Sequence, residues 1–188
     1  RGQAGEGRFE DYQTEVSEGM VVLDAVHAVQ AKQAPDLACR WNCKAGKCGS
    51  CSAEINGKPR LMCMSRLNSL DLNEPVTVEP MRTFPLIKDL VTDVSWNFRV
   101  KKGLKKFKPR KPDAADGTWR MAQRDIDRVQ EFRKCIECFL CQDVCHVVRD
   151  HKKHDVGFIG PRFFVYSAAL EMHPLDTGDR LADLKNAN

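Results

Sequence analysis

The sequence predicts an α+β fold, with a small mixed sheet crossed by one helix and then a mainly helical second half. Three observations lead to this fold class. Asn56-Gly57, the strongest two-residue signal for a β-hairpin, separates two short runs with strand character. Apolar residues recur at helical spacing over 21–32, with an acidic residue in the first turn. A tract at 99–112 holds eight Lys and Arg and no acidic residue, which marks a change of composition between two cysteine-rich parts.

The elements of the first half follow from local patterns. Loose alternation of apolar and polar residues predicts a first strand. Two further short strands are predicted on either side of the Asn56-Gly57 turn. A short β-branched run after a proline predicts a further strand, and a helical pattern returns after it. In chain order we expect a strand over 8–16, a helix over 21–32, a hairpin over 52–63, a strand over 75–78 and a helix over 89–98.

The second half begins with the basic tract, whose prolines argue against regular structure and favour a linker. A helical pattern then leads the chain to Cys135. Another helix is predicted over 161–172, opened by Pro161 at a favoured first-turn position. Its apolar side is expected to carry Phe164, Ala168 and Leu170. These patterns divide the chain into a domain at 1–98, a basic linker at 99–118 and a helical domain at 119–188.

Composition limits the classes of function. A hydrophobic content of 42% excludes a disordered chain, and the longest apolar run, at 163–170, is far shorter than the roughly 20 residues that span a bilayer. The net charge of +4 accompanies 26 acidic residues, so the surface is mixed and we expect no nucleic-acid partner. All nine cysteines fall in two groups, which favours metal binding over a dispersed disulfide framework.

The first cysteine motif has the spacing C-x4-C-x2-C followed by one later cysteine. This is the plant-type ferredoxin arrangement for a [2Fe-2S] cluster. Gly46 and Gly49 should let backbone amides point at the sulfurs. A zinc site is the alternative, but zinc sites usually combine two C-x2-C pairs. Cys39 stands outside the pattern and is expected to be a partly buried thiol, with a redox or ligand role as the alternative. The four motif residues are Cys43, Cys48, Cys51 and Cys63.

The second cysteine motif has the spacing C-x2-C-x2-C-x3-C of bacterial ferredoxins, which predicts a [4Fe-4S] cluster. His146 stands where proline normally follows. In proteins with two such runs the fourth cysteine binds the other cluster, yet this sequence has a single run. Either the fourth cysteine completes one isolated cluster, or further ligands lie outside this sequence. The motif residues are Cys135, Cys138, Cys141 and Cys145.

Together, CKAGKCGSCSAEINGKPRLMC, CIECFLCQDVC and the later FIGPR resemble the iron-sulfur subunit of the succinate dehydrogenase and fumarate reductase family over most of 8–188. The resemblance implies a plant-type ferredoxin-like (β-grasp) domain followed by a helical bacterial-ferredoxin-like domain. It also implies three clusters. Cys43, Cys48, Cys51 and Cys63 would bind [2Fe-2S], Cys135, Cys138 and Cys141 would bind [4Fe-4S], and Cys145 would bind [3Fe-4S]. The remaining ligands of the last two are expected beyond Asn188, and a first strand before Arg1.

The same resemblance implies a role in electron transfer. The chain would relay electrons from FAD in a flavoprotein subunit to quinone at a membrane anchor, which in some forms carries haem b. It would be held by these partners at the cytoplasmic face of a bacterial plasma membrane. His146, Val147 and Arg149 lie where the family often has Ser and Trp near the quinone, which favours a menaquinone-linked branch.

The sequence allows more than one role for the chain and for two of its segments. A ferredoxin-like electron-transfer subunit of another dehydrogenase is the alternative function. Three histidines after the second motif, His146, His151 and His154, are either surface residues or partners for quinone protons. The basic tract is either a solvated linker or a contact with the flavin subunit or anionic lipid.

Overall fold

The computed structural model describes residues 1–150 and 158–185, and it separates into two compact units. Unit 1 comprises 1–94 and 136–152, whereas unit 2 comprises 95–135 and 153–188. The second cysteine motif is therefore divided, because Cys135 belongs to unit 2 and the other three cysteines belong to unit 1. His151 and His154 lie outside the described residues.

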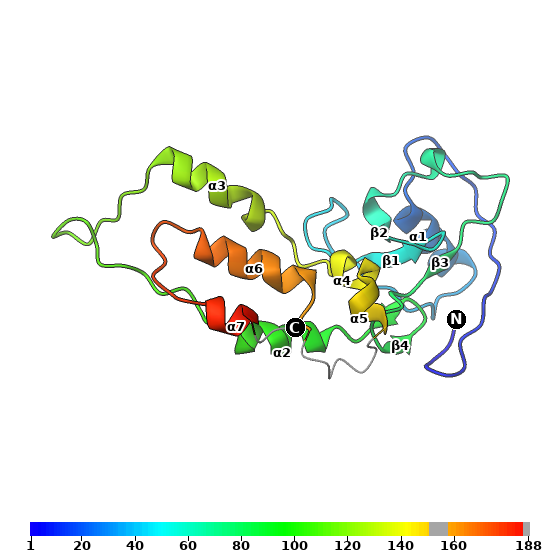
Figure 1. Cartoon of the computed structure of the whole chain (residues 1–188). Coiled ribbons are helices and arrows are strands. Elements are labelled where there is room, and N and C mark those ends of the chain that lie inside the picture. The colour runs from blue at the N-terminus through cyan, green and yellow to red at the C-terminus, as the bar shows by residue number, and fades with distance from the viewer. Residues whose placement is uncertain (151–157, 186–188) are drawn as a thin grey trace. The chain divides into compact units, whose positions relative to one another are not determined.

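Unit 1 is built around a three-stranded antiparallel sheet of order β2-β1-β3 (Figure 1). The predicted hairpin is confirmed: β1, Ser52–Ile55, pairs with β2, Lys58–Leu61. Its turn residues Asn56 and Gly57 have φ of 48° and 71°, as a hairpin turn with two left-handed residues requires. The third strand, β3, covers Val78–Glu79, so it shares only Val78 with the strand predicted over 75–78.

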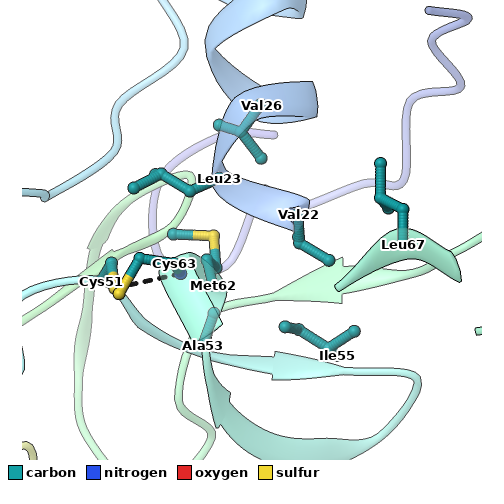
Figure 2. Packing of buried hydrophobic residues seen from close by; sticks show 9 residues of the cluster. All are labelled: Val22, Leu23, Val26, Cys51, Ala53, Ile55, Met62, Cys63 and Leu67. Carbon is teal, nitrogen blue, oxygen red and sulfur yellow. Dashed lines mark hydrogen bonds between the residues drawn. The ribbon is translucent and has the colours of Figure 1, made fainter. Parts of the chain in front are cut away.

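The predicted first helix is confirmed as α1, Val22–Lys32, which begins where Asp24 accepts a hydrogen bond from the backbone amide of Val21. Its apolar side packs on β1 and forms the core of unit 1 (Figure 2). Two short 3-10 helices, η1 at Met62–Met64 and η2 at Leu67–Ser69, close this core. The buried members are Val22, Leu23, Val26, Cys51, Ala53, Ile55, Met62, Cys63 and Leu67.

The strand predicted over 8–16 is wrong, because this segment forms no ladder with any described residue. Side chains hold it instead: the Arg1 guanidinium donates to the Tyr12 hydroxyl, and the Gln33 amide donates to the Gln13 carbonyl at 2.6 Å. Alternation of residue types indicates a half-buried segment but supplies no pairing partner, so the pattern alone could not establish a strand.

The helix predicted over 89–98 begins later than expected. Asp89 is buried and accepts hydrogen bonds from the amides of Gly2 at 2.7 Å and Ala38 at 2.8 Å. It has φ of 50° and makes the turn between β4, Leu86–Lys88, and β5, Val91–Thr92. A carboxylate used in this way fixes a turn, so the helix α2 covers Ser95–Gly103 and includes the start of the basic tract.

Unit 2 is helical, as predicted for the second half of the chain. The expected helix before Cys135 is α3, Gln123–Arg133, and it packs along α6, Pro161–Glu171 (Figure 1). A short helix, α7 at Leu181–Lys185, follows. The predicted apolar side of α6 is wrong at Phe164, which is exposed, because the buried side is centred on Phe163 and Ser167.

The basic tract is more ordered than a solvated linker. After α2 it runs beside 175–177, where Arg110 donates its amide to the Leu175 carbonyl and Thr177 donates to the Lys108 carbonyl, both at 2.8 Å. Arg180, which is 1% exposed, donates to the carbonyls of Lys105 and Lys106. The prediction that the tract lacks regular structure is therefore wrong over 99–103, which belong to α2 and precede the prolines Pro109 and Pro112. Around these prolines the tract is irregular but makes tertiary hydrogen bonds.

The remaining helices of unit 1 are short and belong to the second cysteine motif. They are α4, Leu140–Val144, and α5, His146–Asp150. The segment before them has left-handed backbone at Glu137 and Phe139, with φ of 56° and 61°, so Cys138 lies between two sharp bends. These bends bring Cys138 close to the loop of the first motif.

Candidate functional site

The loop between α1 and β1 carries three of the four cysteines of the first motif. It turns through left-handed backbone at Lys44, Gly46 and Gly49, with φ of 53°, 64° and 70°. A Cβ atom on Gly46 would lie 2.9 Å from the Met64 sulfur, and one on Gly49 would lie 2.7 Å from the Cys138 Cα atom. Both positions thus favour glycine for conformation, and Gly49 needs it for space as well, because it meets backbone atoms while Gly46 meets only the flexible Met64 side chain.

Backbone amides of this loop point at cysteine sulfurs, as the two glycines predicted. Such hydrogen bonds stabilise negative charge on the sulfur and raise the reduction potential of a bound iron-sulfur cluster. Figure 2 shows the bond between Cys63 and Cys51. The donor amides, with their acceptors and distances, are Lys47 to Cys43 at 3.2 Å, Ala45 to Cys43 at 3.4 Å, Ser50 to Cys48 at 3.5 Å and Cys63 to Cys51 at 3.5 Å.

The thiols of the motif have contrasting acidities. Hydrogen bonds from the Ser50 side chain and from backbone amides lower the pKa of Cys48 to about 6, which favours its thiolate. Burial raises the pKa of Cys51 to about 12. Coordination to iron would remove the proton from either thiol, since a coordinating thiol is deprotonated outright.

The four cysteines lie where the core of unit 1 meets its surface. Cys51 and Cys63 are buried at 3% and 5% exposure, whereas Cys43 and Cys48 are half-buried. The described residues contain no group of three or more His, Cys, Asp or Glu side chains arranged to hold one metal ion. Three of the sulfurs accept amide hydrogen bonds, those of Cys43, Cys48 and Cys51, and Cys63 lies in the core beside Cys51. Two half-buried and two buried thiols fit a two-iron cluster, whose ligands are shared between two irons.

Cys39 lies outside this group, as expected. Its thiol is half-buried against the core of unit 1, and burial raises its pKa to about 11. Such a thiol is a poor nucleophile at neutral pH.

The structure places the cysteines of the second motif in different environments. Cys138 is half-buried beside Gly49, Cys141 is exposed in α4, and Cys145 is half-buried between α4 and α5. In unit 2, Cys135 follows α3 and lines a cavity of about 500 Å³ together with Phe107, Phe132, Arg162, Tyr166 and His173. His146 is exposed at the start of α5.

Sequence reasoning missed a group of buried charges behind the second motif. Glu54 on β1 and Asp143 on α4 are both fully buried. Arg149 contacts Glu54 at 2.6 Å and Arg82 contacts it at 3.1 Å, while the amide of Thr83 donates to Asp143 at 3.1 Å. Burial raises the pKa of both carboxyl groups. No local pattern marks these residues, because their partners are 28 to 95 positions away in the chain, apart from Arg149, which is six positions from Asp143.

Comparison with known proteins identifies the family. The 2Fe-2S iron-sulfur cluster binding domain family matches residues 1–99, which include the whole first motif. The fumarate reductase iron-sulfur subunit of Mycobacterium tuberculosis is 34% identical over 90% of this chain and 68% of that relative. This chain belongs to the succinate dehydrogenase and fumarate reductase iron-sulfur subunits.

Two further proteins are similar to this chain. The succinate dehydrogenase iron-sulfur subunit of Bacillus subtilis is 32% identical over 78% of this chain and 56% of that relative. A chain of the Mycobacterium smegmatis Sdh1 complex in the apo form has a TM-score of 0.94 and 58% identity, and the match covers all of this chain and 78% of that one. This iron-sulfur subunit is therefore an electron-transfer component of an oxidoreductase, with a 2Fe-2S domain and a helical part. The cysteines of both motifs are consistent with the three clusters predicted from the sequence.

Proposed function

We propose that this subunit relays electrons between FAD in a flavoprotein subunit and quinone at a membrane anchor, within a succinate:quinone oxidoreductase. The observation that carries the proposal is the amide-lined loop of the first motif, which lies in backbone contact with Cys138 of the second motif. Unit 1 thus holds the first motif together with Cys138 of the second motif. A relay needs this arrangement, because electrons must pass from one bound cluster to the next.

In this proposal, Cys43, Cys48, Cys51 and Cys63 bind [2Fe-2S], while Cys135, Cys138 and Cys141 bind [4Fe-4S] and Cys145 binds [3Fe-4S]. When bound, each cluster accepts and gives up single electrons. The chain holds the sulfurs, directs amide N–H groups at those of the first motif and buries Cys51 and Cys63 away from water. Hydride and proton chemistry on succinate or fumarate belongs to the flavoprotein.

The domain bounds, the location and the anchor cofactors are also part of this proposal. We place a β-grasp ferredoxin-like domain at 1–98, a basic linker at 99–118 and a bacterial-ferredoxin-like helical domain at 119–188. We also place the subunit at the cytoplasmic face of the plasma membrane, held by its partners, with menaquinone as the quinone and haem b as an optional anchor cofactor. No helix within 1–150 or 158–185 is long and apolar enough to cross a membrane.

Anaerobic addition of succinate to the purified complex tests the proposal. We expect succinate to reduce the flavin and then the iron-sulfur clusters, followed by electron paramagnetic resonance (EPR) and visible absorption, and a quinone analogue to reoxidise them. A Cys48→Ser variant should change or abolish the two-iron signal. Clusters that stay oxidised with succinate, yet respond to the substrate of another dehydrogenase, would favour the alternative ferredoxin-like subunit.

A further inference from the structure

The loop of the first motif touches the second motif at one point within unit 1. A Cβ atom built on Gly49 would lie 2.7 Å from the Cα, 2.9 Å from the Cβ and 3.0 Å from the amide nitrogen of Cys138. The first two distances are shorter than real Cβ atoms show, and two of the three atoms, Cα and N, belong to the backbone. The two segments are therefore in direct van der Waals contact, 89 positions apart in the chain.

A serine hydroxyl reinforces this contact. Ser52 is 6% exposed, and its Oγ atom lies 2.9 Å from the carbonyl oxygen of Gly49 and 2.9 Å from that of Cys138. Because a hydroxyl has one proton, it donates to one carbonyl at a time and links the two segments through a single atom. Ser52 begins β1 and is paired with Leu61 of β2, so the hydroxyl is carried by the sheet.

Buried charges fasten the second motif to the same sheet. Arg149 of α5 contacts Glu54 of β1 at 2.6 Å, and the Thr83 amide donates to Asp143 of α4 at 3.1 Å. Glu54 is two residues from Ser52 on the central strand. Arg149 thus holds α5 to the strand that carries the hydroxyl, while Asp143 holds α4 to Thr83 in the segment between β3 and β4. Both helices beside Cys145 are therefore fixed within unit 1, the unit that also contains Gly49 and Cys138.

We propose that Gly49 and Ser52 are positioning residues that form the electron-transfer junction between the two-iron cluster and the cluster held by Cys138. The inference rests on the proposed function. One electron leaves the reduced two-iron cluster, so that one iron changes from Fe(II) to Fe(III), and the same electron reduces the next cluster. No bond forms or breaks, and Ser52 keeps its proton. Gly49 sets the approach of the two segments, and Ser52 connects the loop of one cluster to the ligand residue of the next.

The chain offers a matched pair of variants for this junction. Gly49 and Gly57 have nearly the same left-handed φ, 70° and 71°, so alanine strains the backbone equally at both. A Cβ atom on Gly57 meets nothing within 4 Å, whereas one on Gly49 must push Cys138 away. Any difference between G49A and G57A therefore reports the contact rather than the backbone strain. Ser52→Ala removes the hydroxyl without strain and serves if G49A fails to assemble.

The variants are compared in the purified complex by two EPR measurements. The first is the spin relaxation of the reduced two-iron signal, which a neighbouring paramagnetic cluster accelerates. The second is the rate at which that signal decays after rapid reduction. We expect weaker relaxation enhancement in G49A, several-fold slower decay in G49A and S52A, an unchanged two-iron reduction potential in S52A, and wild-type behaviour in G57A.

The proposal would be overturned if G49A and G57A showed the same spin relaxation and the same decay rate, and if S52A decayed at the wild-type rate. The contact would then contribute only to packing. Failure of the proposed function is distinguishable from this result. If succinate does not reduce the wild-type complex, a chemical reductant still produces the two-iron signal, and its relaxation in the variants still tests the junction.

Discussion

Replacing Arg180 should loosen the contact between the basic tract and the end of unit 2. Its guanidinium is 2% exposed and uses all of its nitrogen atoms as donors, to three carbonyl groups and two carboxylates. Nothing in the local sequence marks this arginine as buried. The acceptors are the carbonyl oxygens of Lys105, Lys106 and Gly178 and the carboxylates of Glu171 and Asp176.

The magnitude follows from what Arg180→Ala leaves behind. The Asp176 side chain is 1% exposed and would lose its guanidinium partner at 2.8 Å. Breaking a buried ion pair by removing one partner costs about 3–5 kcal/mol. Asp176 keeps hydrogen bonds from the amides of Gly178 at 2.7 Å and Lys108 at 3.3 Å, so we expect the lower end, about 3 kcal/mol. Arg180→Lys keeps the charge but not the planar fork and should cost about 1–2 kcal/mol.

Hydrogen exchange followed by mass spectrometry, on the assembled complex, measures this local opening directly. A loss of 3 kcal/mol predicts about 100-fold faster exchange for amides in 105–111 and 175–181. Arg124→Ala is the matched control, because its side chain is 87% exposed. If R180A exchanged at the rate of R124A in both segments, the reasoning about the buried guanidinium would be refuted.

Three other variants test separate parts of the structure. Phe163→Ala should cost about 3–5 kcal/mol because its ring is 1% exposed, whereas the exposed neighbour in Phe164→Ala should cost far less; thermal unfolding of the complex compares them. Arg149→Ala leaves the fully buried carboxylate of Glu54 with one exposed guanidinium partner and should destabilise unit 1 by about 3 kcal/mol, measured by hydrogen exchange in β1. Ser50→Ala removes the side-chain hydrogen bond to Cys48, a proposed cluster ligand, and should lower the two-iron potential by about 40 mV in a redox titration, as about 1 kcal/mol predicts for one electron. The three predictions would be contradicted by an unchanged melting temperature in Phe163→Ala, an unchanged exchange rate in Arg149→Ala and an unchanged potential in Ser50→Ala.

Local chemistry explains which elements were predictable from the sequence. The Asn56-Gly57 turn, the start of α1 at Asp24 and the opening of α6 at Pro161 depend on residues within a few positions. The first cysteine motif was recognisable for the same reason, since three of its four cysteines and both of its glycines occupy one loop. In each case the determining interactions lie close together in the sequence.

The errors arose where distant residues decide the outcome. Asp89 accepts hydrogen bonds from the amides of Gly2 and Ala38. The segment that begins at Asp89 therefore forms a turn, although its sequence pattern predicted a helix. The buried side of α6 was misassigned because Phe163 packs edge-on against Trp96, 67 positions earlier. The contact between Gly49 and Cys138 could not be predicted from the sequence either. The lack of space for a side chain at Gly49 is caused by a residue far along the chain.

Low-temperature EPR of the purified complex, as isolated and after reduction, tests the central claim most directly. We expect a two-iron signal after reduction, which a Cys48→Ser variant alters, and a three-iron signal in the oxidised sample, which a Cys145→Ser variant alters. A complex that shows the two-iron signal with no three-iron signal in any state would contradict the relay and favour an independent ferredoxin-like subunit.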